Sequence, residues 1–251
     1  MRIALKFAYD GNESHGYARQ PNLKTVEGDL IKNLVKHGII QDTKESSFRS
    51  ASRTDKGVSA LGNVVAFSTD ISKKIILQIF TDDFSSILLY GIKDVEPEFN
   101  PRYAKFRQYR YYLQVTDLDI KKIISSFNCF TGEHNFSNFA KLEPYRNPIR
   151  TIDNILFMQE NDILIIDFFA QTFLWHQIRR IISALIKVGS NKIDKEEICK
   201  ALNNPDKRVD TGLAPARPLI LKDVVYNFEF EYDASQLRKL KILERKIISC
   251  L

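Results

Sequence analysis

Alternation of apolar and polar residues at the start of the chain predicts a β-strand. Over Ile3–Tyr9 the large apolar side chains fall on every second position, a period typical of a strand with one buried face. A helical period follows. Thr25 is placed to cap a helix and Gly38 to end it, and the apolar residues between them recur at intervals of three and four. These residues are Val26, Leu30, Ile31, Leu34 and Val35.

The same periodicities predict elements along the rest of the chain. Further strands are expected at Ser47–Ser52, Gly62–Ser68, Ser86–Val95, Tyr109–Val115, Ile152–Gln159, Asp162–Ala170 and Ile220–Tyr232. Further helices are expected at about Ser72–Phe80, Ile120–Phe127, Trp175–Val188, Lys195–Leu202 and Ala234–Leu251. The segment Asp206–Leu219 is expected to be a loop.

The order of these elements predicts an α+β protein with two halves. Each half is expected to hold a mostly antiparallel sheet with helices on one face, because the glycine-rich βα turns of a nucleotide-binding parallel sheet are missing. A proline-containing break at residues 96–101 separates the halves. The expected division is therefore an N-terminal half at 1–100, a C-terminal half at 101–233 and a basic terminal helix at 234–251.

Composition and charge indicate an ordinary globular protein with a polyanionic partner. The 251 residues are 44% hydrophobic and 27% charged, as in an ordinary globular protein, and the net charge of +6 favours a polyanionic partner. Cys129, Cys199 and Cys250 lie far apart, which suggests neither a disulfide framework nor a zinc site and indicates a reduced, cytoplasmic compartment. No apolar run is long enough to cross a membrane, and no signal peptide precedes the first strand.

A short charged segment between two predicted strands is the first candidate for chemistry. Within Arg53–Ala60, the carboxylate of Asp55 stands between two cations, and Gly57 permits a tight or left-handed turn. A loop held by two strands can present a carboxylate rigidly to a ligand, as a nucleophile or general base requires. On spacing alone, however, the segment is more typical of a charged hairpin loop.

The predicted helix after Trp175 supplies a possible counter-ion. Its isoleucines and Leu185 form a continuous apolar arc, and Arg179 falls at the edge of that arc, whereas Arg180 lies on the polar face. An arginine at the edge can direct its guanidinium into a cleft and bind a carboxylate, for which we select Asp55. From the pattern alone, a surface arginine that lays its stem on the core is as good an interpretation.

One strand interleaves aromatic residues with cations. In Phe106–Leu113 the tyrosines could stack on bases while the arginines meet phosphates. The alternative is a strand with an aromatic core face, although three tyrosines in five positions bring more hydroxyl groups than such a strand usually holds. The four histidines show no metal-binding spacing, and no signature of a nucleotide or metal cofactor is present.

Taken together, these motifs resemble those of TruA-type tRNA pseudouridine synthases. The segment Ser52–Ala60 is similar to the family's signature loop, and matching motifs occur in the same order along the chain. They are Tyr9–Gln20, Tyr109–Tyr111, Gly132–Phe139, Phe173–Arg179 and Leu213–Ala216. The tripeptide Trp175-His176-Gln177 resembles the corresponding sequence of archaeal and eukaryotic members more than that of bacterial ones.

The resemblance implies an enzyme that isomerises uridine to pseudouridine in tRNA, in the anticodon stem-loop at nucleotides 38 to 40. It also implies a fold of two ferredoxin-like-derived halves with a central RNA-binding cleft, a homodimer and no cofactor. Asp55 is expected to be the nucleophile, Tyr109 to stack on the base and Arg179 to pair with Asp55. RNA contacts are expected from Arg19, Gln20, Arg53, Lys56, Arg102, Arg107, Arg110 and His176.

Two alternatives to this function remain open at the level of sequence. One is a tRNA-binding or tRNA-folding protein that keeps the scaffold without catalysis, and the other is a synthase for another RNA position. The route by which Asp55 acts is open too: it could attack the nucleoside or assist departure of the base. The apolar residues of the terminal helix could serve a dimer contact or cover the chain's own core.

Overall fold

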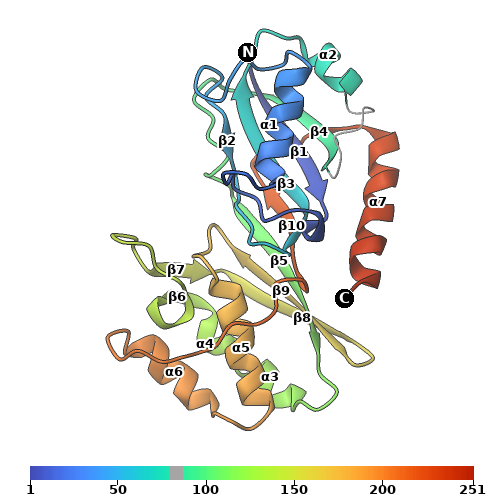
Figure 1. Ribbon diagram of the computed structural model, residues 1–251. Helices are drawn as coiled ribbons and strands as arrows, with labels where there is room; N and C mark the ends of the chain where they lie inside the picture. The colour runs from blue at the N-terminus through green and yellow to red at the C-terminus, as the bar shows by residue number, and fades with distance from the viewer. Residues whose placement is uncertain (80–86) are drawn as a thin grey trace. The chain divides into compact units, whose positions relative to one another are not determined.

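The chain forms two compact units. Unit 1 comprises Met1–Lys105 together with Ile220–Leu251, and unit 2 comprises Phe106–Leu219. The structure is a computed structural model that describes residues 1–79 and 87–251 (Figure 1). Both units combine helices with mostly antiparallel strands, so the predicted α+β class is confirmed.

Unit 1 is built on a sheet with the strand order β11-β4-β1-β3-β10. Its strands are β1 (Arg2–Tyr9), β2 (Arg49–Ser50), β3 (Ser59–Ser68), β4 (Ile87–Val95), β10 (Leu219–Val225) and β11 (Glu231–Tyr232). Its helices are η1 (Gly11–Glu13), α1 (Val26–Lys36), α2 (Lys73–Gln78) and α7 (Ala234–Ser249). Pairing is antiparallel except where β10 runs parallel to β3, and β2 pairs with β3 beside the main order.

The first strand is more buried than its alternation predicts. Every residue of β1 is buried. On the face between the large apolar residues, Lys6 forms an ion pair with Asp223 at 2.5 Å, and its ammonium lies 5.2 Å from the centre of the Phe230 ring. An anion and a ring face thus take the place of water around the buried ammonium. The half-buried strand of the prediction therefore has covered residues on both faces.

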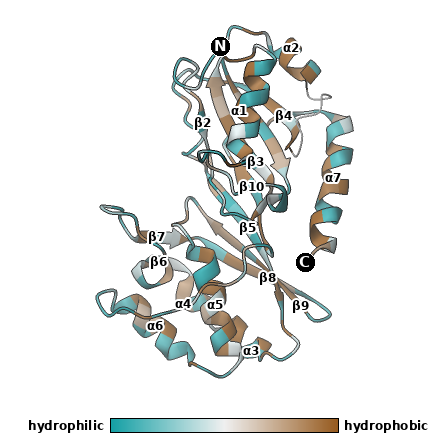
Figure 2. Ribbon diagram, viewed as in Figure 1, coloured by the Kyte–Doolittle hydropathy of each residue, from teal (hydrophilic) through white to brown (hydrophobic). Residues whose placement is uncertain are grey.

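Helix α1 follows its sequence signals. The Thr25 hydroxyl accepts a hydrogen bond from the backbone N–H of Gly28 at 3.3 Å, as an N-cap does, and Gly38 has a φ of 64° just after the helix. Leu30 and Leu34 are fully buried while Lys36 is exposed. Helices α1 and α7 both carry hydrophobic and hydrophilic residues along their length (Figure 2).

Helix α7 covers its own unit. Ile247 is buried, Lys222 of β10 pairs with Glu244, and Lys246 contacts Glu13 at 2.8 Å and Asp10 at 3.6 Å. The terminal helix therefore contacts the loop after β1, and Ile247 contributes to the core of unit 1, whereas Leu237, Leu240 and Leu243 are half-buried and Leu251 is exposed. A role of this helix in a dimer contact stays a prediction.

Unit 2 holds a second antiparallel set of strands in the order β5-β9-β8, and a small sheet of β6 and β7. The strands are β5 (Phe106–Gln114), β6 (Gly132–Asn135), β7 (Ile149–Ile152), β8 (Asn154–Glu160) and β9 (Ile163–Ala170). The helices are α3 (Ile120–Ser125), α4 (Phe127–Phe130), η3 (Ser137–Phe139), α5 (Gln177–Gly189) and α6 (Lys195–Asn203). Along β5 buried residues alternate with half-buried ones, as predicted.

Two of the expected elements need correction. The closing strand expected at Ile220–Tyr232 is wrong, because it breaks after Val225 and resumes only at β11. The rings of Tyr226 and Phe228 stack at 5.2 Å in the intervening segment, so burial of aromatic rings replaces strand pairing there. The expected helix start at Trp175 is wrong by two residues, since His176 has a left-handed φ of 64° that an α-helix cannot contain.

The division into units also differs from the expected halves. The boundary at Lys105 lies near the expected one, but β10 and α7 belong to unit 1, whereas the sequence placed residues 220–233 in the C-terminal half. The parallel pairing of β10 with β3 accounts for this. The predicted ends at Phe80 and Ser86 lie outside the described residues. Within the described part of the chain, the helices are too short or too polar to cross a membrane.

Candidate active site

The loop that carries Asp55 lies between two paired strands, as predicted. Strands β2 and β3 run antiparallel, with Ser50 opposite Val65, and the loop turns where the backbone N–H of Val58 donates to the carbonyl of Asp55 at 3.1 Å. Gly57 has a φ of 85°, which confirms the left-handed turn predicted for it. Asp55 is half-buried, whereas Arg53 and Lys56 are exposed.

The loop after β1 holds this turn through backbone hydrogen bonds. The N–H of Tyr17 donates to the carbonyl of Thr54 at 3.1 Å, and the N–H of Gly57 donates to the carbonyl of Gly11 at 3.3 Å. Side chains add to this contact: the Tyr9 hydroxyl and the Thr54 hydroxyl lie 2.8 Å apart, and the Gly11 N–H donates to Ser59 Oγ at 3.0 Å. The position of the carboxylate loop is therefore fixed from one side by residues 9–17.

Gly11 is the closest point of that contact. A Cβ atom on Gly11 would lie 2.3 Å from the carbonyl oxygen of Val58, far inside van der Waals contact. Gly16 has a φ of 97°, and a Cβ there would lie 3.2 Å from the N–H nitrogen of Lys56. Glycine is required at the first position by packing and at the second by conformation and packing together.

A chain of buried polar groups lies behind the loop. The Tyr17 hydroxyl donates to Ser50 Oγ at 2.8 Å, and Ser50 Oγ donates to Glu27 Oε1 at 2.9 Å. Glu27 also accepts from the backbone N–H of Arg19 at 3.2 Å. Burial raises the pKa of Tyr17 well above its usual value. The phenol therefore stays neutral and keeps donating, so the chain of hydrogen bonds persists.

In unit 2, Tyr109 is placed on the buried face of β5. It stands opposite Phe168 of β9, and its ring meets the Phe173 ring edge-on at 5.4 Å. Its neighbour on the same face, Tyr111, donates its hydroxyl to the carbonyl of Pro215 at 3.2 Å. Burial raises the pKa of Tyr111 to about 12, and nearby Arg179 opposes that shift.

Arg179 is clamped by the loop that follows α6. Its Nε donates to the carbonyl of Ala214 at 2.8 Å, and its own carbonyl accepts from the N–H of Ala214 at 3.1 Å. The half-buried side chain at the edge of the apolar face of α5 agrees with the prediction. The sequence reasoning missed Ala214 as the residue that orients Arg179. The motif Leu213–Ala216, which was noted without a role, was the available signal.

Two arginines expected to contact RNA have partners within unit 2. Arg110 binds Asp167 through Nε at 2.9 Å and an η nitrogen at 2.7 Å. This bidentate ion pair raises the pKa of Arg110. Arg107 is buried and donates to the carbonyl of Gln171. Both arginines therefore stabilise the β5–β9 region, which accounts for their positions without an RNA contact.

The segment before α5 exposes an aromatic side chain. Trp175 is 45% exposed, and the Lys141 ammonium lies 4.0 Å from the centre of its ring. The next residue, His176, adopts the left-handed conformation, which is rare for a non-glycine residue and clusters at functional sites. Gln20, another residue expected to contact RNA, lies in unit 1, and its side-chain amide donates to the carbonyl of His15 at 2.9 Å.

Asn138, in the motif Gly132–Phe139, has a structural role. Its amide group donates to the carbonyls of Ala201 and Lys207 at 2.9 and 3.1 Å and accepts from the N–H of Val209 at 3.0 Å. Asn138 thus fixes the start of the loop that leads to Ala214. Within the motif Gly132–Phe139, Asn138 thus supports the loop whose Ala214 binds Arg179.

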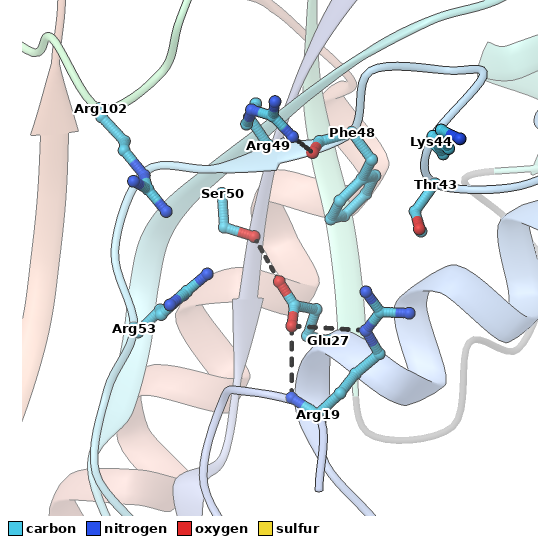
Figure 3. Close-up of a pocket in the computed structure, with 9 residues that line it drawn as sticks. All are labelled: Arg19, Glu27, Thr43, Lys44, Phe48, Arg49, Ser50, Arg53 and Arg102. Atoms are coloured by element: carbon cyan, nitrogen blue, oxygen red, sulfur yellow. Dashed lines mark hydrogen bonds and ion pairs between the residues drawn. The ribbon is translucent and has the colours of Figure 1, made fainter.

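Asp55 lies in unit 1, and Tyr109 and Arg179 lie in unit 2. The pairing of Asp55 with Arg179 therefore stays a prediction. In unit 1 the structure brings together Arg19, Arg53 and Arg102, three of the residues expected to contact RNA, around one pocket with Glu27 (Figure 3). Arg49 and Lys44 also line this pocket, and the sequence reasoning missed both.

Comparison with known proteins decides the family. Residues 127–227 match the family described as tRNA pseudouridine synthase. The tRNA pseudouridine synthase A of Thermococcus sibiricus is 43% identical over 98% of this chain and 93% of its own length. The chain belongs to the tRNA pseudouridine synthase family. Those of Pyrococcus furiosus and Methanosphaera stadtmanae are 38% and 36% identical, over 98% and 97% of this chain and 92% and 90% of their own lengths.

Membership confirms the resemblance and the class of enzyme. This tRNA pseudouridine synthase is an isomerase that acts on tRNA. The three relatives compared here are archaeal, in agreement with the archaeal-like motif Trp175-His176-Gln177.

Proposed function

We propose that the enzyme isomerises uridine in the anticodon stem-loop, at nucleotides 38 to 40, with Asp55 as the catalytic carboxylate. Support comes from the rigid mounting of the Asp55 loop between β2 and β3 and against residues 9–17. A half-buried carboxylate on such a loop is accessible to a nucleotide and has little freedom to move.

The reaction requires the target uridine to leave the base stack, at a cost of a few kcal/mol. Asp55 then promotes cleavage of the bond between N1 of the base and C1′ of the ribose. The base turns, C5 bonds to C1′, the C5 proton leaves and N1 takes up a proton. Substrate and product are isomers, so the balance requires no oxidant, reductant or group donor.

Tyr109 and Arg179 have complementary roles in this proposal. Tyr109 stacks on the base while it turns, and its edge-on contact with Phe173 supports the orientation of its ring. Arg179 pairs with Asp55 and balances its negative charge. The bonds between Arg179 and Ala214 support a fixed direction for the guanidinium.

Release of tritium from tRNA labelled at uridine C5 tests the reaction, and sequence mapping of pseudouridine in the product tests the positions. We expect release with modification confined to nucleotides 38 to 40. Modification at another position would contradict the proposed target. Normal tRNA binding without tritium release would contradict catalysis and would favour a tRNA-binding protein.

Arg179→Leu and Arg180→Leu form a matched pair for the counter-ion, since both remove a half-buried arginine from the first turn of α5. We expect Arg179→Leu to lower the single-turnover rate at least tenfold more than Arg180→Leu. Equal effects would contradict the pairing with Asp55.

We also propose that the enzyme acts as a homodimer in the cytoplasm. Edge strand β8 supports the dimer: Leu156 and Met158, on one face of that strand, are about half exposed, and such a pair is costly to leave in water. Light scattering after size-exclusion chromatography should give twice the chain mass, and Leu156→Lys with Met158→Lys should give the single mass. A monomeric wild-type enzyme would refute this proposal.

A further inference from the structure

A strongly basic pocket lies in unit 1, next to the Asp55 loop. Its volume is about 470 Å³, within the range of small-ligand sites. The charged groups that line it are Arg19, Lys44, Arg49, Arg53, Arg102 and Glu27. Five cations against one carboxylate leave a net charge of +4. Figure 3 shows Arg53 and Arg102 on one side of Glu27 and the guanidinium of Arg19 on the other.

Glu27 does not cancel the field of the pocket. Its two oxygens accept from Ser50 and from the backbone N–H of Arg19, and its Oε2 lies 3.7 Å from Arg19 Nε. The carboxylate is therefore a buried anchor that orients Arg19. The other cations come from separate segments: the chain around β2 supplies Lys44 and Arg49, the Asp55 loop supplies Arg53, and the segment after β4 supplies Arg102.

We infer that this pocket binds a backbone phosphodiester of the tRNA strand that carries the target uridine. The inference rests on the proposed function. Several guanidinium groups around one cavity favour a phosphate, because each can donate two parallel hydrogen bonds to its oxygens. Phe48 is the one apolar residue among those lining the pocket, so an apolar ligand has little to bind.

The position of Arg53 relates the phosphate to the reacting nucleotide. Arg53 and Asp55 are two residues apart, so their Cα atoms lie at most about 7 Å apart. A phosphate held by Arg53 therefore belongs to a nucleotide close to the one that Asp55 attacks. Such a contact carries no base identity and instead fixes the register of the strand.

Tyr17 connects the pocket to the Asp55 loop. Its hydroxyl donates to Ser50, which donates to Glu27 in the lining of the pocket, and its N–H donates to the carbonyl of Thr54. One buried residue thus supports both the phosphate site and the catalytic loop. By holding one phosphate, the pocket fixes the register of the RNA strand and so positions the uridine relative to Asp55.

Arg49→Gln tests the pocket, with Lys36→Gln as the matched control. Both remove one exposed cation from unit 1, but Lys36 lies at the end of α1 and not in the pocket. The measurement is tRNA affinity as a function of salt. We expect Arg49→Gln to weaken binding about five- to tenfold at 0.1 M salt. Its logarithmic salt slope should fall by about 0.7 to 0.9, the value for one phosphate contact. Lys36→Gln should leave both quantities unchanged.

Thr43, which also lines the pocket, offers a test that does not remove any native cation. Thr43→Lys adds a positive charge to the pocket and should tighten binding, whereas Thr43→Glu should weaken it. Equal affinities and slopes for wild type, Arg49→Gln and both Thr43 variants would overturn the inference. Weaker binding of inorganic phosphate to Arg49→Gln with unchanged tRNA affinity would also overturn it, since the pocket would then serve a free anion.

These outcomes separate the inference from the proposed function. Affinity and salt slope are measured without turnover, so a wild-type enzyme that modified a different position could still lose one phosphate contact in Arg49→Gln. Conversely, suppose that the enzyme modifies nucleotides 38 to 40 and that Arg49→Gln leaves the salt slope unchanged. The proposed function would then hold, and the inference that the pocket binds a phosphate would be contradicted.

Discussion

Gly11→Ala adds a single methyl group where the loop after β1 contacts the Asp55 loop. The added Cβ would lie 2.3 Å from the carbonyl oxygen of Val58, whereas ordinary contact begins near 3.4 Å. The difference, 3.4 minus 2.3 Å, is about 1 Å, and one of the two backbone segments must move by this amount. The N–H of Gly57 bonds to Gly11 and the N–H of Val58 to Asp55, so the movement reaches the carboxylate.

The expected effects follow from this displacement. Overpacking of this kind costs about 1–3 kcal/mol, which corresponds to a fall in melting temperature of roughly 2–4 °C per kcal/mol for a chain of this size. A misplacement of about 1 Å at a reacting group costs on the order of 100-fold in rate. The assay is single-turnover tritium release at saturating enzyme, alongside thermal unfolding.

Gly38→Ala is the matched control. Gly38 has a φ of 64°, and a Cβ there meets no atom within 4 Å, so alanine costs about 1–2 kcal/mol through backbone strain alone. The two variants should lose comparable stability, but only Gly11→Ala should lose rate. A wild-type rate for Gly11→Ala would refute the claim that residues 9–17 position Asp55.

Two further predictions concern unit 2. Arg110→Gln should lower stability by about 1–3 kcal/mol, because it breaks a bidentate and partly buried ion pair with Asp167, and should leave the salt slope of tRNA binding unchanged; a lower slope would restore Arg110 to the RNA contacts. Burial raises the pKa of Tyr111 from 10 to about 12, so the stability from its neutral form is fully present below pH 10 and is lost as pH rises through about 12. Melting temperatures measured against pH should therefore fall more steeply for wild type than for Tyr111→Phe above pH 10, and parallel curves would contradict the assignment.

Local signals made much of the fold predictable from the sequence. The Thr25 cap, the left-handed Gly57 and the two faces of β5 depend on neighbouring residues, and the structure shows each of them. The break after Val225 was not predictable, because the alternation continues through the buried aromatic rings that follow it.

Long-range pairing limits what the sequence shows of the site. Arg110 appears in the chain as a free cation on an aromatic strand, and only the register of β5 with β9 sets it opposite Asp167. The same holds for Arg179 and Ala214, which are 35 residues apart. The basic pocket gathers Arg19, Arg49 and Arg102 from three distant segments, and no local pattern marks them as neighbours.

The most direct test of the central claim is tritium release from uridine-labelled tRNA by Asp55→Asn. The substitution keeps the shape of the half-buried side chain and removes its charge. The account predicts no release above background, with tRNA affinity and melting temperature close to those of the wild type. Full release by Asp55→Asn would contradict it.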